Sequence, residues 1–275
     1  MGIAILMSVY RGDKPEYFER AMRSISGEQT RKPDQVVLVL DGPVEAELRR
    51  VIELVQREIG DSLRLVPLET NQGLGRALDA GLRECNQELV ARMDADDIAM
   101  PERLERQEQF LNEHSDIDVV GSGAQEIDEA GVEGARRRVP EAHDELLAML
   151  WTNPFIHSSV MFRRERILCA GGYDSNLRRR QDYELWFRAA ENGLRFGNID
   201  EPLVKYRFDR NTHKKQPVAL AWEQALIGFR GSKRLRLEWW KQIGCFVPFV
   251  RALLPGWAQH GLYKALGRID PRRGR

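Results

Sequence analysis

Three carboxylates follow a short apolar run, because Asp94, Asp96 and Asp97 come directly after residues 89–93. An extended chain points residues i and i+2 in the same direction, so Asp94 and Asp96 can reach one target. Carboxylates this close repel one another unless a cation lies between them. Oxygen ligands that are few and open to solvent suit Mg²⁺ or Mn²⁺ shared with a substrate phosphate. The other interpretation is an acidic turn, in which Asp96 or Asp97 caps a helix that Pro101 enters.

Asp182 is a second acidic side chain whose surroundings suit chemistry. It lies at the start of a helix predicted over 181–192, on the same face as Leu185, Trp186 and Ala189. An acid on an otherwise apolar face near a helix N-terminus is either a cap or a general base that faces a cleft. The sequence leaves both interpretations open.

Two further polar residues, Tyr10 and Asp41, each follow an apolar run of the N-terminal half. Tyr10 is either a half-buried aromatic residue at a strand end or a ring that stacks on a nucleotide base. Asp41 precedes Gly42 and Pro43, so it is either a turn residue or a carboxylate that accepts a hydrogen bond from a pyrimidine N–H. The chain contains neither the G-x-G-x-x-G loop of dinucleotide-binding proteins nor the P-loop pattern, so neither class is supported.

A parallel sheet is the element that could bring these side chains together. Runs rich in apolar residues predict strands at 3–10, 35–40, 63–67 and 89–93, with helical segments between them. Strands that alternate with helices form parallel sheets with right-handed crossovers. Ligands of such sheets bind beyond the carboxyl ends of the strands. Because Tyr10, Asp41, Asn71 and Asp94 all follow strand ends, we expect them to converge on one crevice.

Helical periodicity and turn residues predict the remaining elements. The first helix is predicted to start with Asp13 as its N-cap, a second to cover 44–59, and a third to open at Leu74. After Pro101 a helix is predicted to run to about His114. The sequence then predicts strands at 118–123, 158–162, 194–199 and 203–208, and helices at 141–150 and 181–192.

The chain is predicted to form one domain over residues 1–215, in two parts at 1–100 and 101–215, with a helical tail at 216–275. From Arg230 to the end the sequence holds eleven basic residues against two acidic ones, among several aromatic side chains. A basic and aromatic amphipathic stretch suits the interface of an anionic membrane. The alternative is a helix that packs on the domain or on a dimer partner.

The bulk composition is that of a globular protein. Apolar residues make up 42% of the 275 residues and charged residues 31%, while Lys plus Arg and Asp plus Glu both number 42, which gives no hint of a nucleic-acid partner. Three scattered cysteines suggest neither a disulfide framework nor a zinc site. The apolar start lacks a basic n-region, and no run reaches the ~18 apolar residues of a membrane span. We therefore expect a cytoplasmic protein.

A basic cluster begins at the end of the last predicted strand, with Arg207, Arg210 and His213 close together in the sequence. One interpretation is a solvated loop. The other is a flap whose cations meet a diphosphate, with His213 as an extra metal ligand. His157, before Ser158, is first interpreted as a structural residue at a strand edge.

Taken together, these motifs resemble the family-two glycosyltransferases of the GT-A fold, especially bacterial enzymes that build cell-surface polysaccharides. The resemblance covers residues 3 to about 210. It is carried, in order, by Met7-Ser8-Val9-Tyr10, Val39-Leu40-Asp41-Gly42, Asn71-Gln72-Gly73-Leu74-Gly75, Met93-Asp94-Ala95-Asp96-Asp97, His157-Ser158-Ser159-Val160, Gly171-Gly172-Tyr173 and Gln181-Asp182-Tyr183-Glu184-Leu185-Trp186. It implies an α/β protein with a Rossmann-like, mostly parallel central sheet flanked by helices, followed here by the C-terminal helical tail.

The resemblance also implies roles for residues. Asp182 would be the catalytic base of an inverting transfer, and Mn²⁺ or Mg²⁺ would be held by Asp94 and Asp96, with His213 as the third ligand. The donor, expected to be a UDP-linked sugar, would contact Ser8, Tyr10, Asp41, Asn71, Gly73, Arg76, Asp94, Ala95, Asp96, Arg207 and Arg210. The implied acceptor is a hydroxyl of a glycan or of a polyprenyl-linked sugar, reached from the inner face of the plasma membrane.

Two departures from the family pattern and two other function classes stay open. Gln181 stands where the family usually has Glu, and Asp209 stands where a histidine is common, so either His213 substitutes or the third ligand is missing. A nucleotidyltransferase would also use an acidic metal pair, but residues 10–13 fit its loop poorly. A non-catalytic sugar-nucleotide sensor would bind the donor without transferring or hydrolysing it.

Overall fold

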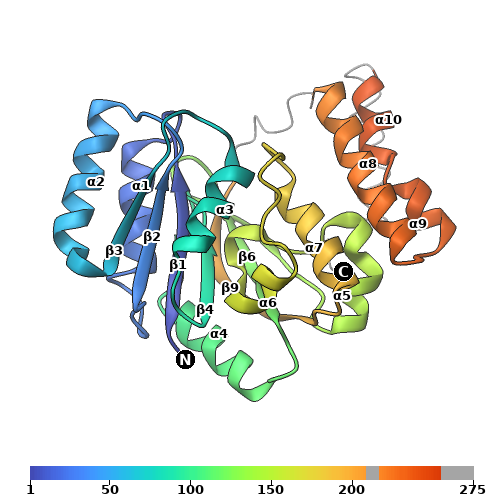
Figure 1. Ribbon diagram of the computed structural model, residues 1–275, viewed down its shortest axis with the longest axis horizontal. Coiled ribbons are helices and arrows are strands. Elements are labelled where there is room, and N and C mark those ends of the chain that lie inside the picture. The colour runs from blue at the N-terminus through green and yellow to red at the C-terminus, as the bar shows by residue number, and fades with distance from the viewer. Residues whose placement is uncertain (209–216, 255–275) are drawn as a thin grey trace.

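A nine-stranded sheet covered by helices on both faces forms the frame of the protein in a computed structural model that describes residues 1–208 and 217–254 (Figure 1). The strand order is β3-β2-β1-β4-β8-β6-β9-β5, and β7 pairs with β6. The first four strands in this order are mutually parallel, while β8 runs antiparallel to both β4 and β6. The sheet is therefore mixed, with a parallel N-terminal half.

The N-terminal half confirms the predicted alternation of strands and helices. Its elements are β1 (Ile3–Val9), α1 (Pro15–Ile25), β2 (Gln35–Leu40), α2 (Ala46–Ile59), β3 (Leu63–Pro67), α3 (Leu74–Glu84) and β4 (Leu89–Met93). The parallel register pairs Val9 with Leu40 and Met7 with Met93. The carboxyl ends of β1, β2 and β4 consequently lie at the same end of the sheet, and the residues that follow them face the same side of the molecule.

The predicted cap of the first helix is wrong. Lys14, not Asp13, is the N-cap of α1, and it makes no side-chain capping bond. The Asp13 carboxylate instead turns back and accepts a hydrogen bond from the Tyr10 N–H at 2.8 Å. A short acidic side chain can bond the backbone on either side of it, and here the turn after β1 competes successfully with the helix.

The second half departs further from the prediction. It contains β5 (Ile98–Ala99), α4 (Arg103–Glu113), β6 (Val119–Ile127), β7 (Glu133–Arg137), α5 (His143–Met149), β8 (Met161–Arg163), α6 (Arg164–Cys169), α7 (Gln181–Glu191) and β9 (Phe196–Arg207). Because β5 follows the acidic residues, Asp96 and Asp97 do not cap a helix, and α4 begins two residues beyond Pro101. The strands predicted at 194–199 and 203–208 form the single strand β9, whose pairing with β6 shifts register around Pro202.

Two layers of helices cover the sheet. Residues of α1, α2 and α4 share one buried apolar cluster, and residues of α3, α5, α6 and α7 share the other. Along β4 the side chains alternate, so Leu89, Ala91 and Met93 pack in the first cluster while Val90 packs in the second. Arg92 and Asp94 therefore project toward the layer that contains α7.

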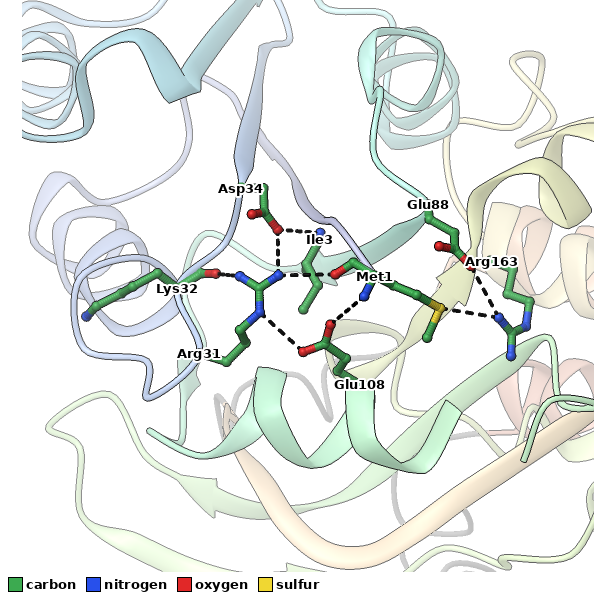
Figure 2. A network of polar contacts seen from close by, with 8 residues as sticks. All are labelled: Met1, Ile3, Arg31, Lys32, Asp34, Glu88, Glu108 and Arg163. Atoms are coloured by element: carbon green, nitrogen blue, oxygen red, sulfur yellow. Dashed lines mark hydrogen bonds and ion pairs between the residues drawn. The ribbon is translucent and has the colours of Figure 1, made fainter. Parts of the chain in front are cut away.

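The end of the sheet opposite these carboxyl ends is fixed by ion pairs (Figure 2). Arg31 contacts Glu108 of α4 at 3.2 Å and Asp34 at 2.7 Å. Asp34 also accepts a hydrogen bond from the Ile3 N–H at 2.8 Å. These contacts join the starts of β1 and β2 to α4.

In the described part of the chain, β9 is followed by three helices, α8 (Val218–Arg234), α9 (Trp239–Gly244) and α10 (Val247–Leu253); α8 lies beside α7, and α9 and α10 contact α8 (Figure 1). Small residues let α8 approach α7 closely. A Cβ atom at Gly228 would lie 2.3 Å from the Tyr183 hydroxyl, and one at Gly231 would lie 2.2 Å from the Phe187 ring. The start of the predicted tail is thus packed on the domain.

Among the helices of residues 1–208 and 217–254, none is both long enough and apolar enough to cross a lipid bilayer.

Candidate active site

An acidic cluster lies at the carboxyl end of β4, as predicted. Asp94, Asp96 and Asp97 each offer a carboxylate oxygen, and these oxygens lie within 4.8 Å of one another. Asp94 is half-buried, Asp96 is exposed and Asp97 is buried. One Asp97 oxygen accepts the Arg207 N–H at 2.7 Å, while its buried Oδ2 finds no partner among the described residues. This set of hard oxygen donors fits a divalent cation.

Burial and mutual repulsion act on these carboxyl groups. Burial and the charge of Asp94 raise the pKa of Asp96 to about 6, and burial with the Asp94 and Asp96 charges raises the pKa of Asp97 well above its ordinary value. Asp13 belongs to the same site, since burial and the charges of Asp96 and Asp94 raise its pKa to about 7. The sequence analysis missed Asp13, although its place just after a strand end was a usable signal.

Mn²⁺ is expected to stabilise the protein more at pH 7.5 than at pH 5. The raised pKa values of Asp13 and Asp96 mean that the folded chain holds protons which the unfolded chain releases near pH 4, so stability falls as the pH rises from about 4 to 7. A bound cation replaces these protons. At a concentration about a hundredfold above its Kd, Mn²⁺ should contribute about 2.7 kcal/mol at pH 7.5. Thermal unfolding with Mn²⁺ or with chelator would contradict this if the Tm shift were equal at both pH values.

Arg92 is a buried cation beneath this cluster. It is 1% exposed, and its Nη2 donates to Asp94 Oδ1. Its Nε and Nη1 have no partner among the described residues. A second buried cation lies behind it, because Arg103 Nη2 donates to the Arg92 carbonyl at 2.7 Å, and burial and the Arg92 charge lower the pKa of Arg103 to about 9. The sequence signal for Arg92 as the buried partner of Asp94 is the presence of an arginine inside an apolar strand.

Arg207 lies next to the cluster but is held by backbone carbonyls. Its Nε donates to the Asp96 carbonyl at 2.9 Å and its Nη1 to the Asp128 carbonyl at 2.7 Å. Its guanidinium stacks 3.9 Å from the centre of the Tyr17 ring. The predicted residues Arg210 and His213 lie outside the described residues.

The Asp41 carboxylate organises the loop that opens α3. Asp41 is 5% exposed; its Oδ1 accepts the Gln72 N–H at 2.7 Å, and its Oδ2 accepts Asn71 Nδ2 and the Gly73 N–H, both at 2.9 Å. A carboxylate offers about four acceptor positions, so one remains. Asp41 is thus more than a turn residue, since it fixes the predicted donor-binding segment at Asn71 and Gly73.

The loop before α7 packs on the same segment, residues 71–75. Arg178 Nη2 donates to Asn71 Oδ1 at 2.6 Å, and the Leu74 N–H donates to the Arg178 carbonyl at 3.3 Å. A Cβ atom at Gly75 would lie 2.1 Å from the Leu177 carbonyl oxygen. Gly73 has φ +94°, which only glycine adopts without strain, and this conformation lets the two loops meet.

The other predicted donor contacts lie around this loop and the strand ends. Ser8 is half-buried in β1, and Ala95 is buried between Asp94 and Asp96. Tyr10 is 45% exposed, and Arg76 is exposed in the first turn of α3. A donor role for these residues stays a prediction.

Asp182 is not a helix cap. The N-cap of α7 is Arg180, in the left-handed conformation with φ 64° and without a side-chain capping bond, and Asp182 is the second helical residue. Its Oδ2 accepts a hydrogen bond from Asn153 Nδ2 at 2.9 Å. The side chain is half-buried, so it is open to a ligand.

Tyr173 links Asp182 to the acidic cluster. Burial raises the pKa of this phenol, and the charges of Asp182 and Asp94 add to that effect, so both carboxylates are within electrostatic range of it. The Tyr173 hydroxyl lies 3.0 Å from His157 Nε2. Burial and the Arg92 charge lower the pKa of His157 well below its ordinary value, which keeps the imidazole neutral at pH 7. The structural interpretation of His157 therefore fits.

Buried polar atoms without a partner gather in this region. Of ten such side-chain atoms among the described residues, seven belong to the surroundings of the carboxylates: Arg92 Nε and Nη1, Asp97 Oδ2, Asn153 Oδ1, Ser158 Oγ, Gln181 Oε1 and Trp186 Nε1. Buried polar groups are normally paired with protein or water. Their concentration here indicates a place where a polar ligand or ordered water completes the hydrogen bonds.

Sequence comparison finds related proteins over most of the chain. The family model for glycosyl transferase family 2 matches residues 4–183. The amylovoran biosynthesis glycosyltransferase AmsE of Erwinia amylovora is 38% identical over 204 residues, which cover 74% of this chain and 75% of that protein. The UDP-Gal:alpha-D-GlcNAc-diphosphoundecaprenol beta-1,3-galactosyltransferase of Escherichia coli is 34% identical over 214 residues, covering 78% of this chain and 76% of that protein.

Solved structures share the fold at low sequence identity. S. aureus TarS 1–349 in complex with UDP-GlcNAc superposes with a TM-score of 0.67 at 18% identity, covering 98% of this chain and 80% of that one. A longer TarS chain is matched over half its length. The mannosyltransferase PcManGT of Pyrobaculum calidifontis, in complex with GDP-Man and Mn²⁺, gives a TM-score of 0.60 at 18% identity, covering 98% of this chain and 81% of that one. The predicted GT-A fold is thereby confirmed.

Proposed function

Because the chain belongs to glycosyl transferase family 2, we propose that it moves a sugar from a UDP-linked donor to a hydroxyl group of a glycan or polyprenyl-linked acceptor. One arrangement carries this proposal: the acidic cluster suited to a cation lies at the carboxyl end of β4, Asp94 projects toward the helix layer that contains α7, and α7 carries the half-buried Asp182 carboxylate. The E. coli relative, whose name gives a UDP-galactose donor and a diphosphoundecaprenol-linked acceptor, supports the choice of substrates and of cell-surface polysaccharide synthesis.

The proposed reaction is a single displacement with inversion. Asp182 takes the proton of the acceptor hydroxyl while that oxygen bonds to the anomeric carbon of the donor. The bond between this carbon and the phosphate oxygen breaks, and the nucleoside diphosphate leaves with the bonding electrons. Asp94 and Asp96 would hold Mn²⁺ or Mg²⁺, which when bound offsets the negative charge of the diphosphate. Arg76 and Arg207 contribute further positive charge at the same edge of the sheet.

On the nucleotide side, we assign the base to the region beyond the carboxyl ends of β1 and β2. The exposed Tyr10 ring offers a stacking surface, and the remaining acceptor position of Asp41 suits a pyrimidine N–H. Ser8, Asn71 and Gly73 would contact the part of the donor between the base and the acidic cluster. His213 and Arg210 stay predicted contacts of the metal and the diphosphate.

The direct test is release of nucleoside diphosphate from a panel of sugar nucleotides with Mn²⁺. The panel contains UDP-galactose, UDP-N-acetylglucosamine, UDP-glucose and GDP-mannose, and water serves as a slow acceptor where none is supplied. We expect one UDP-sugar to be hydrolysed well above the others and chelator to stop the reaction. Tight binding of a UDP-sugar without any release would instead identify a sugar-nucleotide sensor.

We further propose that the outer face of α9 and α10 touches an anionic lipid bilayer. This face consists of five exposed apolar side chains: Trp239, Ile243, Val247, Val250 and Leu253. Trp239 is 73% exposed, which is unusual for the largest apolar side chain. Four exposed basic side chains, Arg230, Lys233, Arg234 and Arg236, precede α9 in the chain, and this charge complements anionic headgroups.

Replacing three of these side chains should release the protein from vesicles. The triple variant Ile243→Ser, Val250→Ser and Leu253→Ser is expected to bind vesicles containing phosphatidylglycerol at least tenfold more weakly, since burial of a single apolar side chain already contributes about this factor. Flotation measures the bound fraction. Leu54→Ser, at an exposed apolar residue of α2, is the matched control and should bind like the wild type. If the triple variant floats as well as the control, this face does not meet the membrane.

A further inference from the structure

We infer that Asn153 is a positioning residue for the base Asp182 and that the C-terminal helices hold it in place. The inference rests on the proposed function, because it assigns the support of the proposed base. It concerns the segment between α5 and the 3-10 turn η3 (His157–Ser159), which the sequence analysis did not connect with the site. The observations are a hydrogen bond to the base, a constrained backbone, and packing against α9.

The hydrogen bond fixes one oxygen of the base. Asn153 Nδ2 donates to Asp182 Oδ2 at 2.9 Å, across 29 positions of sequence. Binding one carboxylate oxygen sets the orientation of the other, and Asp182 Oδ1 is thereby left for an acceptor hydroxyl. Gln181, which precedes the base in the chain, is buried, and its Oε1 has no partner among the described residues. The support comes from Asn153 instead.

The backbone of Asn153 is constrained so that its amide points at the base. The residue has φ 54° and ψ 76°, in the left-handed region that asparagine adopts more readily than other non-glycine residues. It ends the 3-10 turn η2 (Leu150–Thr152), and its N–H donates to the Leu150 carbonyl at 2.9 Å. Asn153 Oδ1 is buried without a partner among the described residues. The amide is therefore built into the site and does not lie on the surface.

Trp151, two residues earlier, connects this turn to the C-terminal helices. Its carbonyl accepts the Tyr183 hydroxyl at 2.7 Å, and Tyr183 is next to Asp182 in α7. Its ring meets Trp240 of α9 edge to face, with 5.7 Å between the ring centres. A Cβ atom at Gly244, at the end of α9, would lie 2.6 Å from the Trp151 ring.

These contacts form a continuous path from α9 through Trp151 and Asn153 to Asp182. The outer face of α9 carries the apolar residues assigned above to the membrane. A shift of α9 would therefore also displace the turn that orients the base. The structure thus joins the proposed lipid contact to the chemistry through packed side chains.

The experiment is a double-mutant cycle on hydrolysis of the UDP-sugar found with the panel. Asn153→Gly removes the amide and keeps a residue that favours the left-handed conformation. Asn153→Asp keeps the size and replaces the donor N–H by an acceptor oxygen. Both should lower kcat roughly 10–100-fold through a misplaced base, with unchanged KM and unchanged affinity for UDP and Mn²⁺.

The second arm of the cycle is Trp240→Ala, which should lower kcat about three- to tenfold in the wild type and have no further effect in Asn153→Gly. Trp222→Ala is the matched control. The two side chains are 44% and 49% exposed, but Trp222 packs on Phe246 and Phe249 instead of on the turn. Its kcat should stay within about twofold of the wild type.

The outcomes separate this inference from the proposed function. If Asp182→Asn hydrolyses the donor at the wild-type rate, both the assignment of the base and this inference are wrong. If Asp182→Asn is inactive while both Asn153 variants keep wild-type kcat, only the positioning role is overturned. An equal effect of Trp240→Ala in both backgrounds would overturn the link to α9. A loss of UDP affinity in Asn153→Gly would show a role in donor binding and would likewise contradict the inference.

Discussion

Asp182→Asn is expected to lower turnover of the sugar donor by about 10²–10⁴-fold, because an amide cannot take the proton of the attacking hydroxyl. The substitution keeps the size of the side chain and an oxygen that can accept the Asn153 amide at its present 2.9 Å. The fold and the acidic cluster should therefore be unchanged. The measurement is release of nucleoside diphosphate under saturating donor and Mn²⁺.

Two controls make this result specific. The affinity of the variant for UDP with Mn²⁺ should equal that of the wild type, since the loss is confined to the chemical step. Asp144→Asn makes the same substitution in the first turn of another helix, α5, at an exposed position, and should leave turnover unchanged. Wild-type turnover in Asp182→Asn would refute the assignment of the base.

Asp94→Ala and Asp96→Ala are expected to fail in different ways, although the residues are two positions apart. Asp94 is the ion-pair partner of Arg92, and Arg92 is fully buried. Removing one partner of a buried pair costs about 3–5 kcal/mol, because the other charge stays buried without compensation. The Asp96 side chain is accessible to solvent, although the protein packed around its carboxyl group and the Asp94 charge raise its pKa, so removing it relieves repulsion and should preserve stability.

Thermal unfolding with and without Mn²⁺ separates the two effects. Asp94→Ala should lower the Tm by roughly 6–20 °C, since each kcal/mol moves the Tm of a chain of this size by about 2–4 °C. Asp96→Ala should keep the Tm but lose the rise caused by Mn²⁺, together with Mn²⁺-dependent binding of UDP. Asp94→Asn, which keeps an oxygen for Arg92, should recover most of the stability.

Either of two results would contradict this account. Equal stability of Asp94→Ala and Asp96→Ala would show that Arg92 does not depend on Asp94. Wild-type Mn²⁺ dependence in Asp96→Ala would show that the cluster does not hold the cation. Because Asp94→Ala is expected to lower the stability and to remove a proposed metal ligand at the same time, Asp96→Ala is the cleaner probe of the metal.

The sequence by itself determined the frame of the protein and the edge at which its chemistry lies. Apolar runs specify β1, β2 and most of β4, because strands buried on both faces need apolar side chains at nearly every position, whereas β3 is a partly exposed edge strand. Polar residues directly after such strands must lie at one edge of a parallel sheet, and this placed Asp94 and Asp41 correctly. The ordered motifs added the family, which the comparisons confirm.

The tertiary structure decided how individual side chains are used. Asp13 fits a helix cap in the sequence but bonds the Tyr10 backbone and joins the acidic cluster. Arg92 looked like one residue of an apolar strand, and only packing shows it buried against Asp94. Asn153 meets Asp182 across 29 positions, and α8 rests on α7 through Gly228 and Gly231. Local pattern fixes strands and turns because their forces act between near neighbours, whereas hydrogen bonds between distant segments exist only once the chain has folded.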